Sequence, residues 1–148
     1  TGKQMGCIAS SDDHWARPGT CGLAGVWSRE GLTRDEIIDA LLDRNCYATT
    51  SDRAILHFDV EKGAHPELGI RAAAGTPIEK VEIIKNGEVV YSSTPNALTT
   101  EERWIDPSEP SECWYYVRLT LAEQAVCEES LVNKKQFVWS SPVKIEGG

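Results

Sequence analysis

The fold class follows from residues 81–91, which read Val81-Glu82-Ile83-Ile84-Lys85-Asn86-Gly87-Glu88-Val89-Val90-Tyr91. Two runs rich in apolar residues flank the dipeptide Asn86-Gly87. A type I′ turn requires positive φ at both central residues, and asparagine followed by glycine adopts it readily. The stretch therefore predicts a β-hairpin with strands at 81–85 and 88–91.

Alternation of apolar and polar residues continues on both sides of this hairpin. Further strands are expected over residues 56–60, 68–74, 99–105, 114–121 and 137–145. With the hairpin they make about seven strands separated by turn residues, which is typical of an immunoglobulin-like β-sandwich. The sequence therefore predicts a mainly β chain, with the sandwich over residues 52–148.

Residues 1–51 follow a different pattern, and the domain boundary is expected near Ser51-Asp52. Met5–Ser10 is a short apolar run that predicts a strand buried on both faces. A loop rich in glycine and proline is expected over Arg17–Gly25, then a helix, then a strand over Cys46–Thr50. Strand, loop, helix and strand in this order make a short α/β segment.

The helix of this segment has clear end signals. Thr33 is an N-cap candidate, and Glu36 three residues later completes a capping box. One face of the helix is apolar and carries Ile37, Ile38, Leu41 and Leu42. Because this face and the first strand need a cover, we expect both to pack on the sandwich or on a second copy of the chain.

Composition and charge exclude several classes of partner. The 148 residues are 41% hydrophobic and 26% charged, as expected of a soluble globular protein. The 23 acidic and 15 basic residues leave a net charge of −8, which repels nucleic acid and anionic membranes. No apolar run approaches the roughly 18–20 residues of a membrane span. Nucleic acid and membrane are therefore not expected as partners.

The five cysteines, Cys7, Cys21, Cys46, Cys113 and Cys127, include no CxxC pair. Their spacing fits neither a zinc ribbon nor a complete disulfide framework. We expect free thiols, and this favours a reducing compartment such as the cytoplasm over the periplasm.

Asp12-Asp13-His14 directly follows the first predicted strand, at its carboxyl end, where α/β proteins collect functional groups. In an extended stretch, residues two apart point the same way, so Asp12 and His14 are candidate ligands of one divalent ion. The alternative is that an aspartate caps a turn and His14 bonds to nearby backbone. Spacing alone does not decide between the two.

These residues and several later stretches resemble the C-terminal end of a family of uncharacterised microbial proteins. Members of that family are similar to the PHP superfamily, named for polymerase and histidinol phosphatase. The resemblance rests on Ile8-Ala9-Ser10-Ser11-Asp12-Asp13-His14, Arg17-Pro18-Gly19, Gly22-Leu23, Leu32-Thr33-Arg34, Ala40-Leu41, Cys46-Tyr47-Ala48-Thr49-Thr50, Val81–Gly87 and Trp139-Ser140-Ser141-Pro142.

The resemblance implies a distorted (β/α)₇ barrel that holds up to three divalent metals, which polarise a phosphoester and activate water. The last barrel motif of that pattern is Asp-x-His, which maps onto Asp12 and His14 as metal ligands and gives Asp13 no ligand role. The cofactor implied is zinc, manganese or iron. Trp15, next to the motif, is a candidate wall of the substrate pocket; packing against the barrel is its other reading.

The remaining ligands of the pattern are a His-x-His and further His and Glu residues that precede the match. They are missing here, because the other histidines, His57 and His65, are expected at surface positions of the sandwich. Residues 1–51 are therefore expected to be the last piece of a PHP-like barrel, and the chain is not expected to be an active hydrolase, a metal-dependent phosphoesterase, by itself. Its expected partner is the missing N-terminal barrel portion or a second copy of the chain.

The alternative function is a non-catalytic binding or interaction module that recognises a glycan or a protein partner. Trp104, Trp114 and Trp139 are the candidate aromatic platform for sugar stacking. Packing in the core or at a sheet edge is the other explanation for tryptophans in a sandwich.

Overall fold

The computed structural model describes residues 4–12, 14, 19, 21–50, 52–63, 65–108, 112–127 and 130–146, and for 124–127 and 130–134 it describes the backbone only. One helix and nine strands lie in this part of the chain. In order they are β1 (Leu23–Val26), α1 (Arg34–Leu42), β2 (Cys46–Thr49), β3 (Ile55–Glu61), β4 (Glu67–Lys85), β5 (Glu88–Ser93), β6 (Ala97–Ile105), β7 (Cys113–Cys127), β8 (Ser130–Ser140) and β9 (Val143–Ile145). The prediction of a mainly β chain is confirmed. No helix among these residues is long and apolar enough to cross a membrane.

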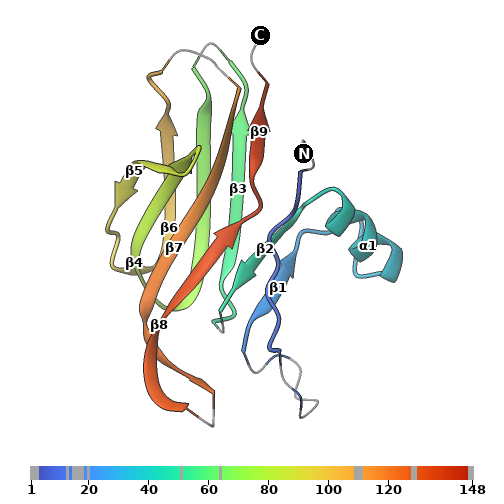
Figure 1. Cartoon of the computed structure of the whole chain (residues 1–148), viewed down its shortest axis with the longest axis vertical. Coiled ribbons are helices and arrows are strands. Elements are labelled where there is room, and N and C mark those ends of the chain that lie inside the picture. The colour runs from blue at the N-terminus through green and yellow to red at the C-terminus, as the bar shows by residue number, and fades with distance from the viewer. Residues whose placement is uncertain are drawn as a thin grey trace.

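All strand pairs are antiparallel, and the strands form one curled sheet in the order β1-β2-β8-β7-β4-β3 (Figure 1). Strand β4 belongs to both arms of the curl. Its residues 67–73 pair with β3 and β6, whereas residues 78–85 pair with β5 and β7. The two strands expected over 68–74 and 81–85 are therefore halves of one long, bent strand.

A buried carboxylate fixes the bend of β4. Asp52, 4% exposed, accepts hydrogen bonds from the backbone N–H of Gly75 at 3.0 Å and of Thr76 at 3.1 Å. The Thr76 hydroxyl donates a third bond to the same carboxylate at 3.0 Å. These donors lie where the pairing register of β4 with β6 shifts, between Ala73 and Ile78. The carboxylate thus satisfies backbone groups that the bend removes from the ladder.

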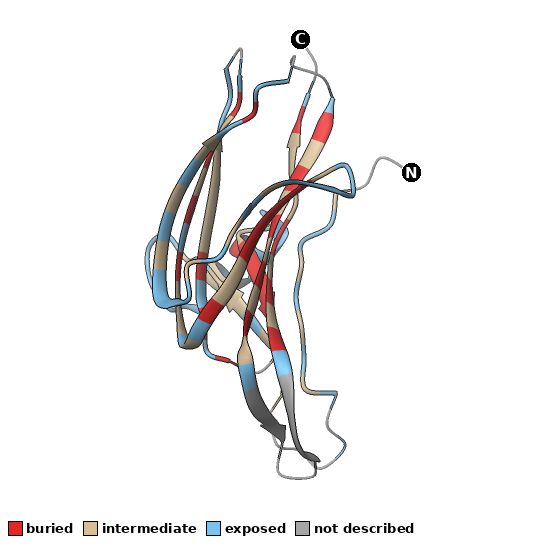
Figure 2. Cartoon of the chain, turned by 90° about the vertical axis from the view of Figure 1, so that its left-hand side faces the viewer, coloured by how far each residue is buried: buried red, intermediate tan, exposed pale blue. Residues whose placement is uncertain are grey.

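The core lies between the two arms of the curl (Figure 2). Alternate residues of β7 point into it, with Val117, Leu119 and Leu121 fully buried. Leu68 and Ile70 of the first half of β4 meet them from the other arm. This is the period-2 pattern expected of strands with one buried face.

The hairpin prediction is confirmed. Asn86 has φ +50° and Gly87 has φ +92°, as a type I′ turn requires. The last predicted strand, over 137–145, is interrupted because Ser141-Pro142 separates β8 from β9. Proline has no N–H to donate to a ladder, which explains the break.

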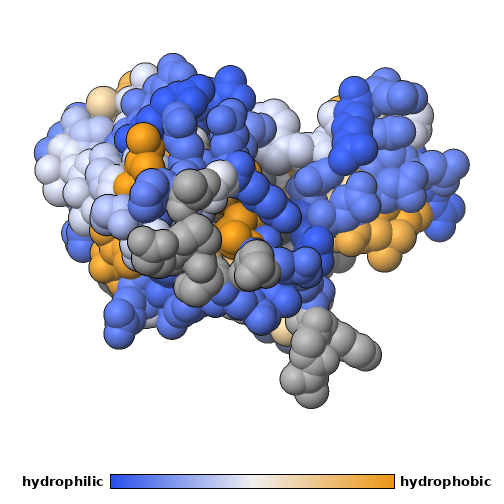
Figure 3. Space-filling model, turned by 90° about the horizontal axis from the view of Figure 1, so that it is seen from above, coloured by the Kyte–Doolittle hydropathy of each residue, from blue (hydrophilic) through white to orange (hydrophobic). Residues whose placement is uncertain are grey.

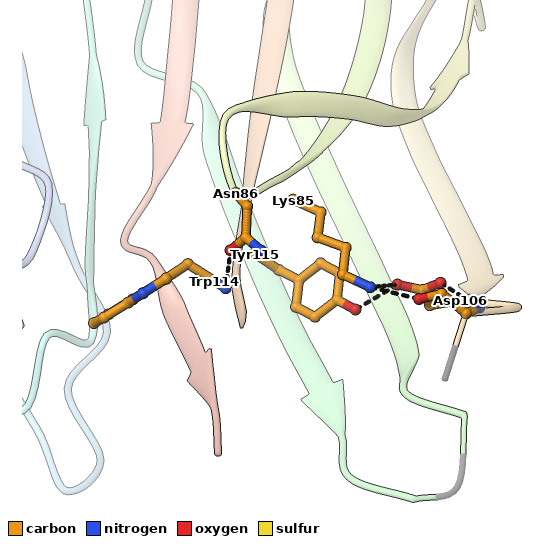
Figure 4. Close-up of polar contacts among 6 residues, drawn as sticks. Lys85, Asn86, Asp106, Trp114 and Tyr115 are labelled. Atoms are coloured by element: carbon orange, nitrogen blue, oxygen red, sulfur yellow. Dashed lines mark hydrogen bonds and ion pairs between the residues drawn. The ribbon is translucent and has the colours of Figure 1, made fainter. Parts of the chain in front are cut away.

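A charged cluster closes one end of the core (Figure 4). The carboxylate of Asp106, 3% exposed, accepts from the ammonium of Lys85 at 2.8 Å, the hydroxyl of Tyr115 and the backbone N–H of Ser108. Burial alone opposes ionisation of this carboxyl, but these bonds, with Lys85 foremost, hold the pKa of Asp106 well below its usual range. Burial and the neighbouring carboxylate raise the pKa of Tyr115.

The helix and the strand after it are confirmed in the N-terminal segment. Thr33 Oγ1 accepts a hydrogen bond from the Glu36 N–H at 3.3 Å, as an N-cap does. The other half of the capping box does not form. The carboxylate of Glu36 instead accepts from the N–H of Glu30 at 3.4 Å. The strand after the helix, β2, is fully buried.

Strand β2 pairs with β8, so the sheet continues across the domain boundary expected at residues 51 and 52. Strand β1 lies in part of the stretch expected to be a loop.

The prediction of a strand over Met5–Ser10 is wrong. These residues join no ladder, and Met5 and Ile8 are 76% and 62% exposed. Strand β2 already pairs with β1 on one side and β8 on the other, so these residues have no place beside β2. The segment is held instead by a side chain, because the Cys7 N–H donates to Ser141 Oγ at 2.9 Å.

Of the two covers expected for the helix face, the sheet of the same chain is wrong, and a second copy of the chain stays a prediction. Ile38, Leu41 and Leu42 are 44%, 38% and 75% exposed, and Ala40 is the buried residue of α1. Figure 1 shows α1 beyond β1, at the end of the sheet away from the core. Seen from above, an apolar patch faces outward on the lobe where α1 lies (Figure 3). This apolar surface has no cover within the described part of the chain.

The expectation of free thiols holds for Cys7, Cys46 and Cys113 and is wrong for Cys21, which is disulfide-bonded.

Candidate functional site

Asp12 and His14, the two predicted metal ligands, are both exposed. Asp12 has φ +48° and His14 lies in a turn, so the chain is not extended here as the spacing argument supposed. The relative orientation of the two side chains is thus set by a turn. Trp15, the predicted pocket wall, lies outside the described residues.

The segment that carries Asp12 is held down at Ser10. A Cβ added to Gly22 would lie 2.5 Å from the carbonyl oxygen of Ser10, so only glycine allows this approach of the two backbones. Gly22 immediately precedes β1. The end of the sheet therefore positions the polar stretch that begins at Ser11.

The described residues do not complete a metal site. They contain no group of three or more His, Cys, Asp or Glu side chains that could hold a metal ion together. His65 is exposed, and His57 lies half-buried on β3, where its Nδ1 is 3.3 Å from both Asp59 Oδ1 and Arg71 Nη2. Neither histidine joins Asp12 and His14 in a cluster.

Two thiols, Cys7 and Cys46, lie in or beside the same segment. Cys46 Sγ lies 3.4 Å from Ser141 Oγ, which also receives the Cys7 N–H. Burial, and then the neighbouring Cys46, raise the pKa of the Cys7 thiol. A thiol with a raised pKa carries less thiolate at neutral pH and is a weaker nucleophile and metal ligand.

The three tryptophans of the predicted sugar platform are half-buried, and each contacts a different neighbour. They belong to different strands, β6, β7 and β8. The contacts are Trp104 with Tyr91 at 6.0 Å between ring centroids, Trp139 stacked on Phe137 at 5.5 Å, and Trp114 with the ammonium of Lys144 5.8 Å from its ring centroid.

Sequence reasoning overlooked Trp27, which is 40% exposed. Its indole N–H donates to the Leu56 carbonyl on β3 at 2.9 Å, and its ring meets His57 edge-on at 5.4 Å between centroids. The sequence signal for this site is weak, because Trp27 and His57 are thirty residues apart and belong to different predicted units. Trp27 borders an open hollow of about 670 Å³ on the outer face of the β3–β4–β6 arm.

Comparison with known proteins places part of this chain beside a described family. Residues 3–68 match a family described as "Protein of unknown function (DUF3604)". An uncharacterised protein of Chlamydia pneumoniae is 29% identical over 141 residues, and uncharacterised proteins of Chlamydia trachomatis serovar D and Chlamydia muridarum are 27% and 26% identical. Each alignment covers 77% of this chain and 21% of the relative, so the chain spans about a fifth of the length of these relatives. No solved structure matches.

Proposed function

We propose that this chain is the C-terminal part of a longer PHP-like metal-dependent hydrolase that acts on phosphoesters. In this proposal Asp12 and His14 are two of the metal ligands, and residues 1–51 are the last piece of the barrel. The observation that carries it is an accessible carboxylate and imidazole two residues apart, at Asp12 and His14.

The donor set of this chain does not fit a complete site. Zinc and related ions usually take three or four protein ligands, and the described residues bring no third group to Asp12 and His14. The chain by itself is therefore not proposed to hydrolyse anything, and no catalytic step is assigned to its residues.

The uncovered surface is the second support for the proposal. Ile38, Leu41 and Leu42 of α1 are 44%, 38% and 75% exposed, and soluble proteins rarely leave a large apolar patch in the open. The relatives are about five times as long as the matched part. We propose that the preceding part of the longer chain packs on this surface and supplies the missing ligands.

The curled sheet is proposed to be an immunoglobulin-like sandwich over residues 52–148 that serves as an accessory domain. Its support is a core drawn from both arms, with Leu56 and Ile70 facing Val117 and Val138. The pairing of β2 with β8 would fix the barrel end rigidly to this domain.

Metal analysis of the longer protein tests the assignment of ligands. Asp12→Ala and His14→Ala are each expected to lower the bound metal per chain and the hydrolysis of bis(p-nitrophenyl) phosphate. Asp13→Ala is the matched control and is expected to keep both. Unchanged metal content in the Asp12 and His14 variants would refute the assignment.

Sedimentation velocity at several concentrations tests what covers the apolar surface. The longer protein is expected to sediment as a monomer. Its Leu42→Glu variant is expected to be cleaved faster by protease, because the preceding part of the chain no longer packs on α1. A longer protein that forms a dimer, and dissociates when Leu42 is changed, would show that a second copy is the cover instead.

A further inference from the structure

The outer face of the β3–β4–β6 arm carries a hollow of about 670 Å³ that the hydrolase proposal does not use. This volume lies in the range of about 300–1,000 Å³ typical of small-molecule sites. Cross-strand rows define the face: Ile55 opposite Ala73 and Thr99, and His57 opposite Arg71 and Glu101. Ala73 has a small side chain, so the middle of the first row is left open.

Trp27 forms one wall of this hollow. Because its N–H is bound to Leu56 and its ring lies against His57, the indole is held in place while 40% of the residue stays exposed. Such a fixed aromatic ring offers an apolar contact surface at little cost in conformational entropy.

The rim of the hollow is polar and carries unused hydrogen-bonding groups. Arg71 and Glu101 lie directly opposite each other on β4 and β6. Among the described residues, none forms a hydrogen bond or ion pair with the carboxylate of Glu101. The guanidinium of Arg71 reaches only the ring of His57. Donors and acceptors are thus both available next to the indole.

A second, smaller hollow of about 300 Å³ continues along the same face and shares His57, Arg71 and Glu101 with the first. Gly69 and Asp59 line it, and the Asp59 carboxylate lies over Gly69, since an added Cβ there would be 2.7 Å from Asp59 Oδ2. Gly69 and Ala73 are four residues apart on β4, which is about 13 Å along a strand. Together the two hollows form a shallow track longer than one small ring.

We propose that this track binds a neutral oligosaccharide, with one sugar ring on the indole of Trp27 and hydroxyls on Arg71 and Glu101. A sugar ring has an apolar face and a polar edge, which match the fixed aromatic wall and the mixed rim. A neutral ligand is favoured because carboxylates outnumber guanidinium groups along the track and the chain carries −8. The site is independent of Asp12 and His14.

Affinity electrophoresis through gels containing neutral polysaccharides tests the proposal on the chain as it stands. The probes are laminarin, xylan, galactomannan and hydroxyethyl cellulose, with polygalacturonate as the anionic comparison. At least one neutral polysaccharide is expected to retard the chain. Trp27→Ala is expected to weaken binding roughly tenfold, the effect of losing one aromatic contact.

Two further variants separate ligand contact from folding. Ala73→Leu fills the open middle of the row Ile55, Ala73 and Thr99 and leaves the sheet otherwise unaltered. It is expected to reduce the retardation of the chain in the polysaccharide gel. Trp114→Ala, the matched control on the other arm, is expected to bind like the unchanged chain. The proposal is overturned if no neutral polysaccharide retards the chain, if only polygalacturonate does, or if Ala73→Leu binds normally.

Discussion

Replacement of Asp106 by asparagine tests the charged cluster that closes the core. The substitution keeps the side-chain size and removes the charge, so the ammonium of Lys85, whose side chain is 15% exposed, loses its partner at 2.8 Å. Removing one partner of a buried ion pair costs about 3–5 kcal/mol. Because Lys85 retains some access to water, we expect the lower end, about 3 kcal/mol.

Urea unfolding of the chain measures this loss. With a slope of about 2 kcal/mol per molar urea, a loss of about 3 kcal/mol lowers the unfolding midpoint by roughly 1.5 M. The control is Glu79→Gln, which breaks the exposed pair of Glu79 with Lys135 and is expected to cost below about 1 kcal/mol. The double variant Asp106→Asn with Lys85→Met is expected to recover part of the loss, since no unpaired ammonium remains.

The effect has a definite pH dependence. The pKa of Asp106 is lower in the folded chain than the value of 3.8 of a free side chain. A group with a lowered folded pKa stabilises the fold above its unfolded pKa and loses that contribution as pH falls further. The gap between the unchanged chain and Asp106→Asn is therefore expected to be full at pH 7 and to shrink below about pH 4. Equal midpoints at pH 7, or a gap that widens in acid, would show that the pairing of Asp106 with Lys85 does not stabilise the fold.

Three other substitutions probe local features. Gly25→Ala places a Cβ 2.0 Å from the Tyr47 ring, and calorimetry is expected to show Tm lowered by roughly 5 °C. Gly63→Ala, the control, meets only ordinary contacts and should leave Tm nearly unchanged. Thr33→Ala removes the N-cap of α1 and should cost about 1 kcal/mol, seen as faster amide exchange in the helix and largely restored by serine. Asp52→Ala leaves the donors at the β4 bend without their acceptor and should cost roughly 2–4 kcal/mol in urea unfolding; a loss below half of that would show that the bend does not need the carboxylate.

Local signals were sufficient for much of the fold. The Asn86-Gly87 turn, the Thr33 cap and the alternation along β7 depend on neighbours close in sequence, and all three are confirmed. Strand β1 was not predicted because Gly25 within it and Gly22 just before it are typical of a loop. Gly25 is there for a long-range reason, since it lies over the ring of Tyr47 on the next strand.

Long-range relations account for the other differences. The run Met5–Ser10 has the composition of a buried strand, yet both edges of β2 are taken, and Met5 and Ile8 stay exposed outside the sheet. The bend of β4 depends on Asp52, which precedes it by more than twenty residues. Of the candidate sites, the sequence names Asp12 and His14, whereas the hollow beside Trp27 depends on three strands meeting and has no local signature.

Cobalt(II) substitution of the longer protein tests whether His14 binds a metal, as proposed. In proton NMR of the cobalt-loaded longer protein, His14→Ala is expected to remove one strongly shifted imidazole signal, whereas His57→Ala and His65→Ala leave all of them in place. A spectrum of His14→Ala that keeps every shifted imidazole signal would show that His14 is not a metal ligand.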